Sequence, residues 1–244
     1  MATKLRRETL PEQLAEQLIQ LVADRGLEPG DFLPSAAAIA DEFAVSRPVV
    51  REALRTLEAR GLIRTENGRG AIVQPVNSEM LSHYFHRAMS VDRRALVELL
   101  EVRKGLEVES ARLAATRSTG AELAEIAGIV QKMHKAVGRS RTYAELDAEL
   151  HLGIAAATHN TTLLHLIESI RGPLKGSIEA GLRSRENAVH LLRVQELHED
   201  LLHALTRRDP EKAASVMTLH FDEAVQHIAG TVESEPGTER ESLP

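Results

Sequence analysis

The 244-residue sequence contains no cysteine, has no long apolar run and carries no overall excess of positive charge. Without cysteine, nothing requires an oxidising compartment, and any metal site must use histidine and carboxylate side chains. No apolar stretch approaches the roughly 20 residues of a membrane-spanning helix, and the N-terminus lacks the apolar segment of a secretory signal. We therefore expect a soluble, cytoplasmic protein without a membrane partner.

The net charge of -6 argues against non-specific nucleic-acid binding by the whole surface, but the charge is unevenly spread. Between residues 46 and 70 the chain has six arginines and only three acidic residues. With 43% hydrophobic residues, the chain is long enough for two domains that each bury a core. The sequence thus predicts one locally basic segment in an acidic two-domain protein.

The first 75 residues show the order helix, helix, turn, helix and hairpin. Leucines at helical spacing indicate a first helix, and a second, short helix is expected within 35–43. Ser46 can cap a longer helix, which Gly61 ends. Short strands over 62–65 and 70–75 are joined across an Asn-Gly turn. This order is typical of a winged helix-turn-helix.

Beyond residue 78 the sequence shows only helical patterns. The expected helices lie near 79–90, over 92–117, from the capping box Thr119–Glu122, from the capping box Thr142–Glu145, over 161–182 with a bend at Pro173, over 187–208, and after the capping residue Asp209. About seven helices predict an antiparallel all-helical bundle, so the fold class is mainly α. The polar end of the chain, from residue 231, is expected to be disordered.

Arginines repeat every four residues on the helix that Ser46 caps. Arg47, Arg51 and Arg55 fall on one exposed face, opposite an apolar stripe. The N-terminal end of such a helix can enter the DNA major groove, where guanidinium groups bind guanine or clamp phosphates. Arg69, at the hairpin tip, could reach the backbone or the minor groove. The alternative is a solvated face with weak surface ion pairs.

A second constellation combines one carboxylate with three histidines. Asp147 and His151 share one helix face with Tyr143, and His198 and His220 lie on the apolar stripes of two later helices. A buried carboxylate needs a protonated histidine or a cation to neutralise it. A divalent metal would satisfy all four groups, and this donor set suits zinc above all, or nickel or manganese. The alternative is a set of hydrogen-bonded core histidines.

Three stretches of the first domain keep a specific order and spacing: "LEPGDFLPS", "AVSRPVVREALRTLEARGLI" and "NGRGAIV". They resemble the DNA-binding domain of the GntR family of bacterial transcription regulators. The resemblance implies that operator DNA is contacted by Ser46, Arg47, Arg51, Arg69 and Gly70. One departure is the run Ala36–Ala38, where the family usually has charged residues that include a DNA-contacting arginine. A missing cationic contact should weaken binding or alter the operator consensus.

The second domain contains "EVRKGLEVESARLAA", "DAELHLGIAAATHN" and "ELHEDLLHALTRRDPEKAASVMTLHF". These stretches resemble the FCD effector-binding domain of the FadR-type subfamily. The resemblance implies that the metal ligands are Asp147, His151, His198 and His220. It also implies that Arg103 lines the effector cavity, where its guanidinium would bind the carboxylate of a small organic acid. The alternative role of Arg103 is to pair with Glu107, four residues later.

The expected domains are a winged DNA-binding domain at 8–75, a linker and short helix at 76–91, a helical effector-binding and dimerisation domain at 92–229, and a tail at 230–244. The expected function is that of a homodimeric, ligand-responsive transcription regulator, a repressor released by an organic acid, and not an enzyme. Two alternatives remain open. One is a metal-dependent hydrolase that uses the Asp/His cluster, and the other is a constitutive DNA-binding protein with an inert helical domain.

Overall fold

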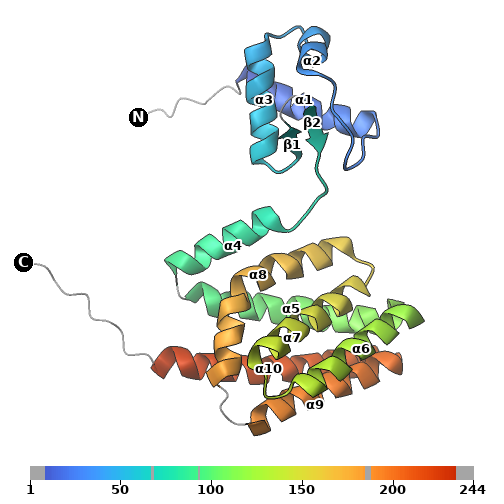
Figure 1. The fold of residues 1–244 in the computed structure, drawn as a ribbon, viewed down its shortest axis with the longest axis vertical. Helices are drawn as coiled ribbons and strands as arrows, with labels where there is room; N and C mark the ends of the chain where they lie inside the picture. The colour runs from blue at the N-terminus through green and yellow to red at the C-terminus, as the bar shows by residue number, and fades with distance from the viewer. Residues whose placement is uncertain (1–8, 67–68, 93, 185–187, 235–244) are drawn as a thin grey trace, which may run out of the picture. The chain divides into compact units, whose positions relative to one another are not determined.

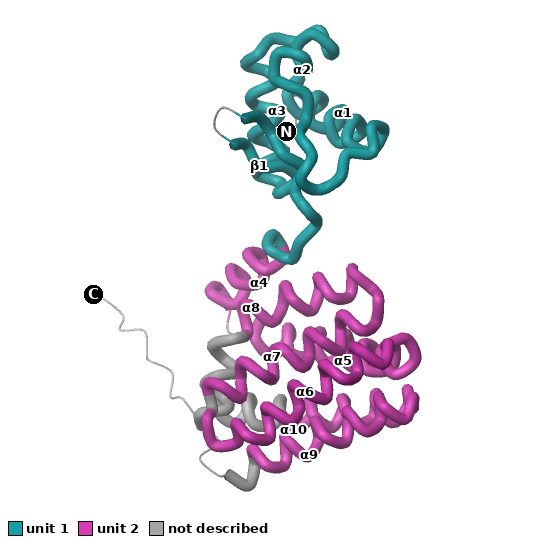
Figure 2. Tube along the Cα trace, turned by 45° about the vertical axis from the view of Figure 1, so that its right-hand side comes forward, with its two compact units in different colours: residues 1–80 teal, residues 81–244 magenta. Residues whose placement is uncertain are grey.

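The computed structural model describes residues 9–66, 69–92, 94–184 and 188–234. The chain divides into two compact units, residues 1–80 and 81–244 (Figure 2). Each unit has its own hydrophobic core. Within the described residues, no helix is long and apolar enough to cross a membrane.

Between residues 9 and 73, the described part of the first unit contains three helices and a small sheet (Figure 1). Its elements are α1 (Leu10–Asp24), α2 (Ala36–Glu42), α3 (Arg47–Ala59), β1 (Ile63–Glu66) and β2 (Gly70–Val73). Leucines of α1 pack against the buried face of α3, because both helices carry apolar residues at helical spacing. β1 and β2 pair antiparallel, with Ile63 opposite Val73. The predicted winged helix-turn-helix is confirmed, whereas residues 67–68, where the Asn-Gly turn was expected, lie outside the described residues.

The segment between α1 and α2 joins the wing, which the sequence patterns did not predict. Phe32 forms an isolated antiparallel bridge with Ile72 of β2, and the backbone N–H of Leu33 donates to the carbonyl of Ala71 at 2.8 Å. The side chain of Leu33 is buried in the core of the unit. A single bridge of this kind leaves no alternating pattern, so periodicity could not have found it.

From residue 79 onward, the described chain contains seven helices and no strand. They are α4 (Glu79–Val91), α5 (Arg94–Arg117), α6 (Gly120–Ala136), α7 (Ser140–Ala156), α8 (Thr161–Ser184), α9 (Ala188–Thr206) and α10 (Pro210–Ser234). The largest core cluster lies between α5, α6, α7, α9 and α10. The expected all-helical bundle is therefore confirmed, and α6 begins at the predicted Thr119–Glu122 capping box. The same bundle positions the polar cluster described below.

Two predicted boundaries were wrong. α7 begins at Ser140 rather than at a Thr142–Glu145 capping box, because the chain already turns at Gly138, whose φ of 87° suits glycine. The backbone N–H of Tyr143 then donates to the carbonyl of Arg139, three residues before the expected capping residue Thr142. At the other end, α10 continues through Ser234, so residues 231–234 are helical rather than disordered. Residues 235–244 lie outside the described residues.

The predicted bend of α8 is visible in Figure 1, where the helix changes direction part-way along its length. Pro173 lies inside α8. Proline has no backbone N–H to donate to the carbonyl four residues earlier, and its ring displaces that carbonyl. The turn before the bend carries Arg171, which belongs to the polar cluster.

Candidate functional site

Three helices bring the four predicted metal-ligating residues together inside the second unit. α7 supplies Asp147 and His151 from one face, α9 supplies His198, and α10 supplies His220. One potential ligand atom from each residue lies within 4.8 Å of those of the other three, and all four residues are buried. Each residue lies among buried apolar neighbours on its own helix, so packing of the core brings the four side chains inward.

Within the described part of the chain, the histidine atoms that face one another in this cluster lack hydrogen-bond partners, as atoms that can bind a metal ion would. His151 Nε2, His198 Nε2 and His220 Nδ1 are buried and make no hydrogen bond. Asp147 Oδ1 lies 3.5 Å from both His151 Nε2 and His198 Nε2. Leaving a buried polar atom unpaired costs about 1–3 kcal/mol. Three such nitrogens beside one carboxylate oxygen fit the nitrogen and oxygen ligands that a divalent metal takes from protein. The cluster can therefore hold a metal ion.

His151 is oriented by a carboxylate that the sequence patterns did not assign to it. Glu107 of α5 contacts His151 Nδ1 through Oε2. With the proton of the imidazole on Nδ1, the lone pair of Nε2 faces the cluster, as a metal ligand requires. The sequence spacing indicates Glu107 only as a partner of Arg103, because a contact between α5 and α7 leaves no local spacing pattern.

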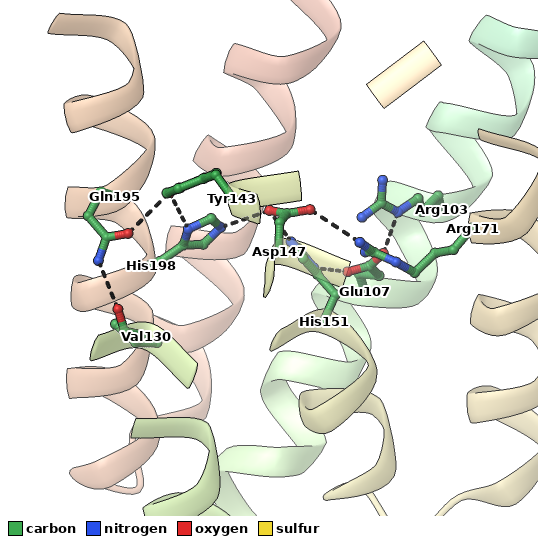
Figure 3. A network of polar contacts seen from close by, with 9 residues as sticks. All are labelled: Arg103, Glu107, Val130, Tyr143, Asp147, His151, Arg171, Gln195 and His198. Atoms are coloured by element: carbon green, nitrogen blue, oxygen red, sulfur yellow. Dashed lines mark hydrogen bonds and ion pairs between the residues drawn. The ribbon is translucent and has the colours of Figure 1, made fainter. Parts of the chain in front are cut away.

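A second chain of hydrogen bonds orients His198 (Figure 3). The Tyr143 hydroxyl donates to Gln195 Oε1 at 3.1 Å, and Gln195 Nε2 donates to the carbonyl of Val130 at 3.3 Å. The Tyr143 oxygen lies 3.2 Å from His198 Nδ1. Because the tyrosine proton is directed to Gln195, its oxygen accepts from the Nδ1–H of His198. This arrangement again leaves Nε2 as the free lone pair in the cluster.

Two buried arginines lie beside the cluster, one predicted and one missed. Arg103 pairs with Glu107 through Nε, and its guanidinium carbon lies 4.9 Å from the centre of the Phe221 ring. Arg171 of α8 donates from Nη2 to Asp147 Oδ2 at 3.2 Å and from Nη1 to Glu107 Oε1 at 3.5 Å. The pairing of Arg103 with Glu107, which the sequence offered as the alternative role, thus forms at the edge of the cluster. Arg171 could have been noticed, because it follows Ile170 on the apolar stripe of α8.

The electrostatics of the cluster favour neutral His198 and His220 and charged carboxylates. Burial lowers the pKa of His198 to about 4, and burial and the neighbouring His198 hold the pKa of His220 well below its ordinary value. Burial would raise the pKa of Asp147, but His151 and Arg171 hold it well below its usual range. Burial likewise opposes ionisation of Glu107, and Arg103 and His151 still lower its pKa. These are the protonation states that metal binding needs.

In the first unit, the predicted arginine face of α3 is exposed. Arg47, Arg51 and Arg55 are exposed, while Val50 on the opposite face is buried. Arg55 pairs with Glu52 at 2.7 Å, whereas Arg47 and Arg51 make no ion pair or hydrogen bond with any described residue. Two cationic side chains of this helix are therefore available to a polyanion.

The remaining predicted DNA-contacting residues also lie on the surface of the first unit. Ser46 occupies the N-cap position of α3, but its side chain makes no capping hydrogen bond. Arg69 is exposed, and its Nη1 lies 3.9 Å from Glu66 Oε2, which is a weak ion pair. Gly70 begins β2 with a φ of 112°, which residues with a side chain rarely adopt. Ala37 and Ala38 are exposed on α2, so this edge of the helix-turn-helix carries no cation.

Each of the two units matches a known family of protein domains. Residues 10–73 match the family of bacterial regulatory proteins called the gntR family, and residues 98–223 match the FCD domain. The chain is 30% identical over 217 residues to the HTH-type transcriptional regulator LutR of Bacillus subtilis (strain 168), covering 87% of this chain and 98% of LutR. It is 31% identical over 213 residues to the Glc operon transcriptional activator of Escherichia coli (strain K12), covering 85% of this chain and 84% of that activator.

The solved structure of Streptococcus agalactiae GntR has the same fold, with a TM-score of 0.70 over 88% of this chain and 99% of that one, at 24% identity. The match of both family descriptions and of these relatives over most of the chain defines its class. The protein belongs to the GntR family of bacterial transcription regulators, and its helical unit is an FCD effector domain.

Proposed function

We propose that this regulator binds a divalent metal ion through Asp147, His151, His198 and His220, with zinc as the expected ion and nickel and manganese as alternatives. One observation carries the proposal: three buried histidine nitrogens without hydrogen-bond partners lie beside a single carboxylate oxygen. Zinc takes histidine nitrogen and carboxylate oxygen ligands and can expand to five-coordinate, which would leave a position for a ligand oxygen beside the four residues. When bound, the metal would attract an oxygen of a ligand as a Lewis acid.

The ligand of this site is a small organic acid. Arg103 is 4% exposed, and its Nε is directed to Glu107. Among the described residues, no hydrogen bond involves its two Nη groups. They can therefore bind a carboxylate, for which guanidinium is the preferred protein partner. The metal ligands and Arg103 would thus hold the acid together.

The acid acts on DNA binding by the first unit. Arg47 and Arg51 of α3 are exposed and unpaired among the described residues, so they can contact bases or phosphates of operator DNA, together with Ser46, Arg69 and Gly70. A homodimer would present two such units to half-sites about 34 Å apart. An acid that favours one arrangement of the units by about 1–3 kcal/mol suffices for regulation. We propose that the acid relieves repression. The DNA-binding assay described below shows whether the acid releases or promotes binding.

The metal half is tested by elemental analysis of the purified protein. We expect about one metal ion per chain in the wild type. His198→Ala should lose most of it while retaining its helical circular dichroism, and His134→Ala, which removes a histidine with a 65% exposed side chain, should not. Full metal occupancy in His198→Ala would exclude this assignment.

The DNA half is tested with an operator selected from random duplexes. Arg51→Ala should weaken binding and lower the dependence of log K on log salt by about one. Arg141→Ala, which removes an arginine with an 88% exposed side chain on α7, is the matched control. Adding acids to metal-loaded protein shows whether they release or promote binding. Equal affinity with every acid would instead indicate constitutive DNA binding.

The metal-dependent hydrolase alternative lacks a general base among the described residues. Glu107 is the carboxylate beside the four residues, and His151, Arg103 and Arg171 all contact it. Positive neighbours hold its pKa low, which makes it a poor proton acceptor at neutral pH. Sustained metal-dependent hydrolysis of esters, amides or phosphates would contradict this conclusion.

A further inference from the structure

We propose that Arg171 is a second anion-binding residue of the effector site and makes the site selective for acids with two negative charges. This inference rests on the proposed metal and acid binding and narrows the class of acid. It is carried by the contacts of Arg171 and by the charge that the buried cluster contains.

Arg171 is buried, but its hydrogen bonds are incomplete. It is 6% exposed, and its two Nη groups contact Asp147 Oδ2 and Glu107 Oε1. Its Nε is buried and has no hydrogen-bond partner. A buried donor without a partner costs about 1–3 kcal/mol, and more when it belongs to a charged group. A carboxylate oxygen of a ligand would supply the missing acceptor.

The charges of the cluster balance only in the absence of a metal ion. Arg103 and Arg171 contribute two positive charges, and Glu107 and Asp147 contribute two negative charges. The three histidines must be neutral to act as ligands. A divalent ion then leaves an excess of two positive charges in a region removed from water. A monocarboxylate cancels one of them and a dicarboxylate cancels both, and an uncompensated buried charge is costly.

The two arginines are arranged so that one ligand can meet both. Arg103 comes from α5 and Arg171 from α8, and both contact the same oxygen, Glu107 Oε1. Figure 3 shows them together on one side of Asp147, while Tyr143, Gln195 and His198 lie on the other. The cationic groups are therefore concentrated on one side of the carboxylate ligand, where two anionic ends of one acid can be bound.

The test measures acid binding to the metal-loaded full-length protein by calorimetry, with pairs matched in carbon number: succinate against butyrate, and malate against 2-hydroxybutyrate. In the wild type, we expect the dicarboxylate of each pair to bind at least about tenfold more tightly. Arg171→Gln keeps a polar side chain but removes the charge. It should bring the ratio close to one and leave monocarboxylate affinity within about threefold. Arg171→Lys should keep most of the preference.

Arg112→Gln, which removes a partly exposed arginine of α5 that pairs with Glu109 and Glu211, should leave the ratio unchanged. The metal content of each sample is measured by elemental analysis, and if Arg171→Gln loses the metal, the metal-loaded Arg171→Lys and the wild-type ratio decide. Equal affinity for both members of each pair, or an undiminished preference in metal-loaded Arg171→Gln, overturns the inference while monocarboxylate binding still supports the proposed function. If no acid binds metal-loaded wild-type protein, the proposed function fails as well.

Discussion

Mild acid should destabilise the metal-free protein, because His198 and His220 are buried in a form that does not readily accept a proton. Burial lowers the pKa of His198 from 6.5 to about 4 in the folded state, and His220 shifts in the same direction. Between these pH values the unfolded chain binds protons that the folded chain does not. The free energy of unfolding therefore falls as pH falls through this window. For His198 alone, the difference corresponds to about 3 kcal/mol.

The chain offers a selective probe for this measurement. It has no tryptophan, and its two tyrosines, Tyr84 and Tyr143, both belong to the second unit. Urea unfolding of chelator-treated protein, followed by tyrosine fluorescence at several pH values between 7 and 4.5, therefore reports on the unit that contains the cluster. His198→Gln should weaken the pH dependence, and the exposed His134→Gln should leave it unchanged. The same unfolding free energy at pH 7 and pH 5 would refute the argument.

Three further substitutions test the surroundings of the site. Tyr143→Phe removes the hydroxyl next to His198, so metal affinity should fall about 10–100-fold. The absorption spectrum of the cobalt-substituted protein should also change, and an unchanged spectrum would contradict the orienting role of Tyr143. Glu107→Gln leaves two buried arginines short of a counter-charge and should cost about 3–5 kcal/mol in urea unfolding, whereas the same substitution at the exposed Glu109 should cost little. Gly172→Ala places a methyl group 3.2 Å from Ser82 Oγ. It should speed hydrogen exchange in α4, and equal exchange in both proteins would exclude this contact as a constraint.

The sequence predicted the convergence of the four residues because each lies on an apolar helix stripe. A helix that buries leucines on one face must also bury a histidine on that face. The Asp147–His151 spacing sets two of the side chains side by side, and compact packing of α9 and α10 brings His198 and His220 to them. The winged unit was predictable for a different reason, since its turns require particular residues.

The residues around the cluster could not be predicted in the same way. Periodicity shows which face of a helix is buried, but it does not show which helix will pack against that face. Glu107 contacts a histidine 44 positions later, and Tyr143 contacts Gln195 across 52 positions. Arg171 on the apolar stripe of α8 was a visible anomaly, yet its partners Asp147 and Glu107 come from two other helices. Such contacts follow from tertiary packing alone.

A short stretch of α8 connects the cluster to α4, the first helix of the second unit. Arg171 contacts Asp147 and Glu107, while its neighbours Ile170 and Leu174 form a core with leucines of α5, against which Phe85 and Met89 of α4 pack. One turn of α8 thus contributes both to the polar cluster and to the core against which α4 packs. An acid bound to Arg171, as proposed above, would change the contacts of this turn. Only a ligand whose contacts differ between two arrangements can shift their populations. α4 follows directly on the DNA-binding unit in sequence. The same turn of α8 therefore carries both the contacts that a ligand would change and the residues against which α4 packs.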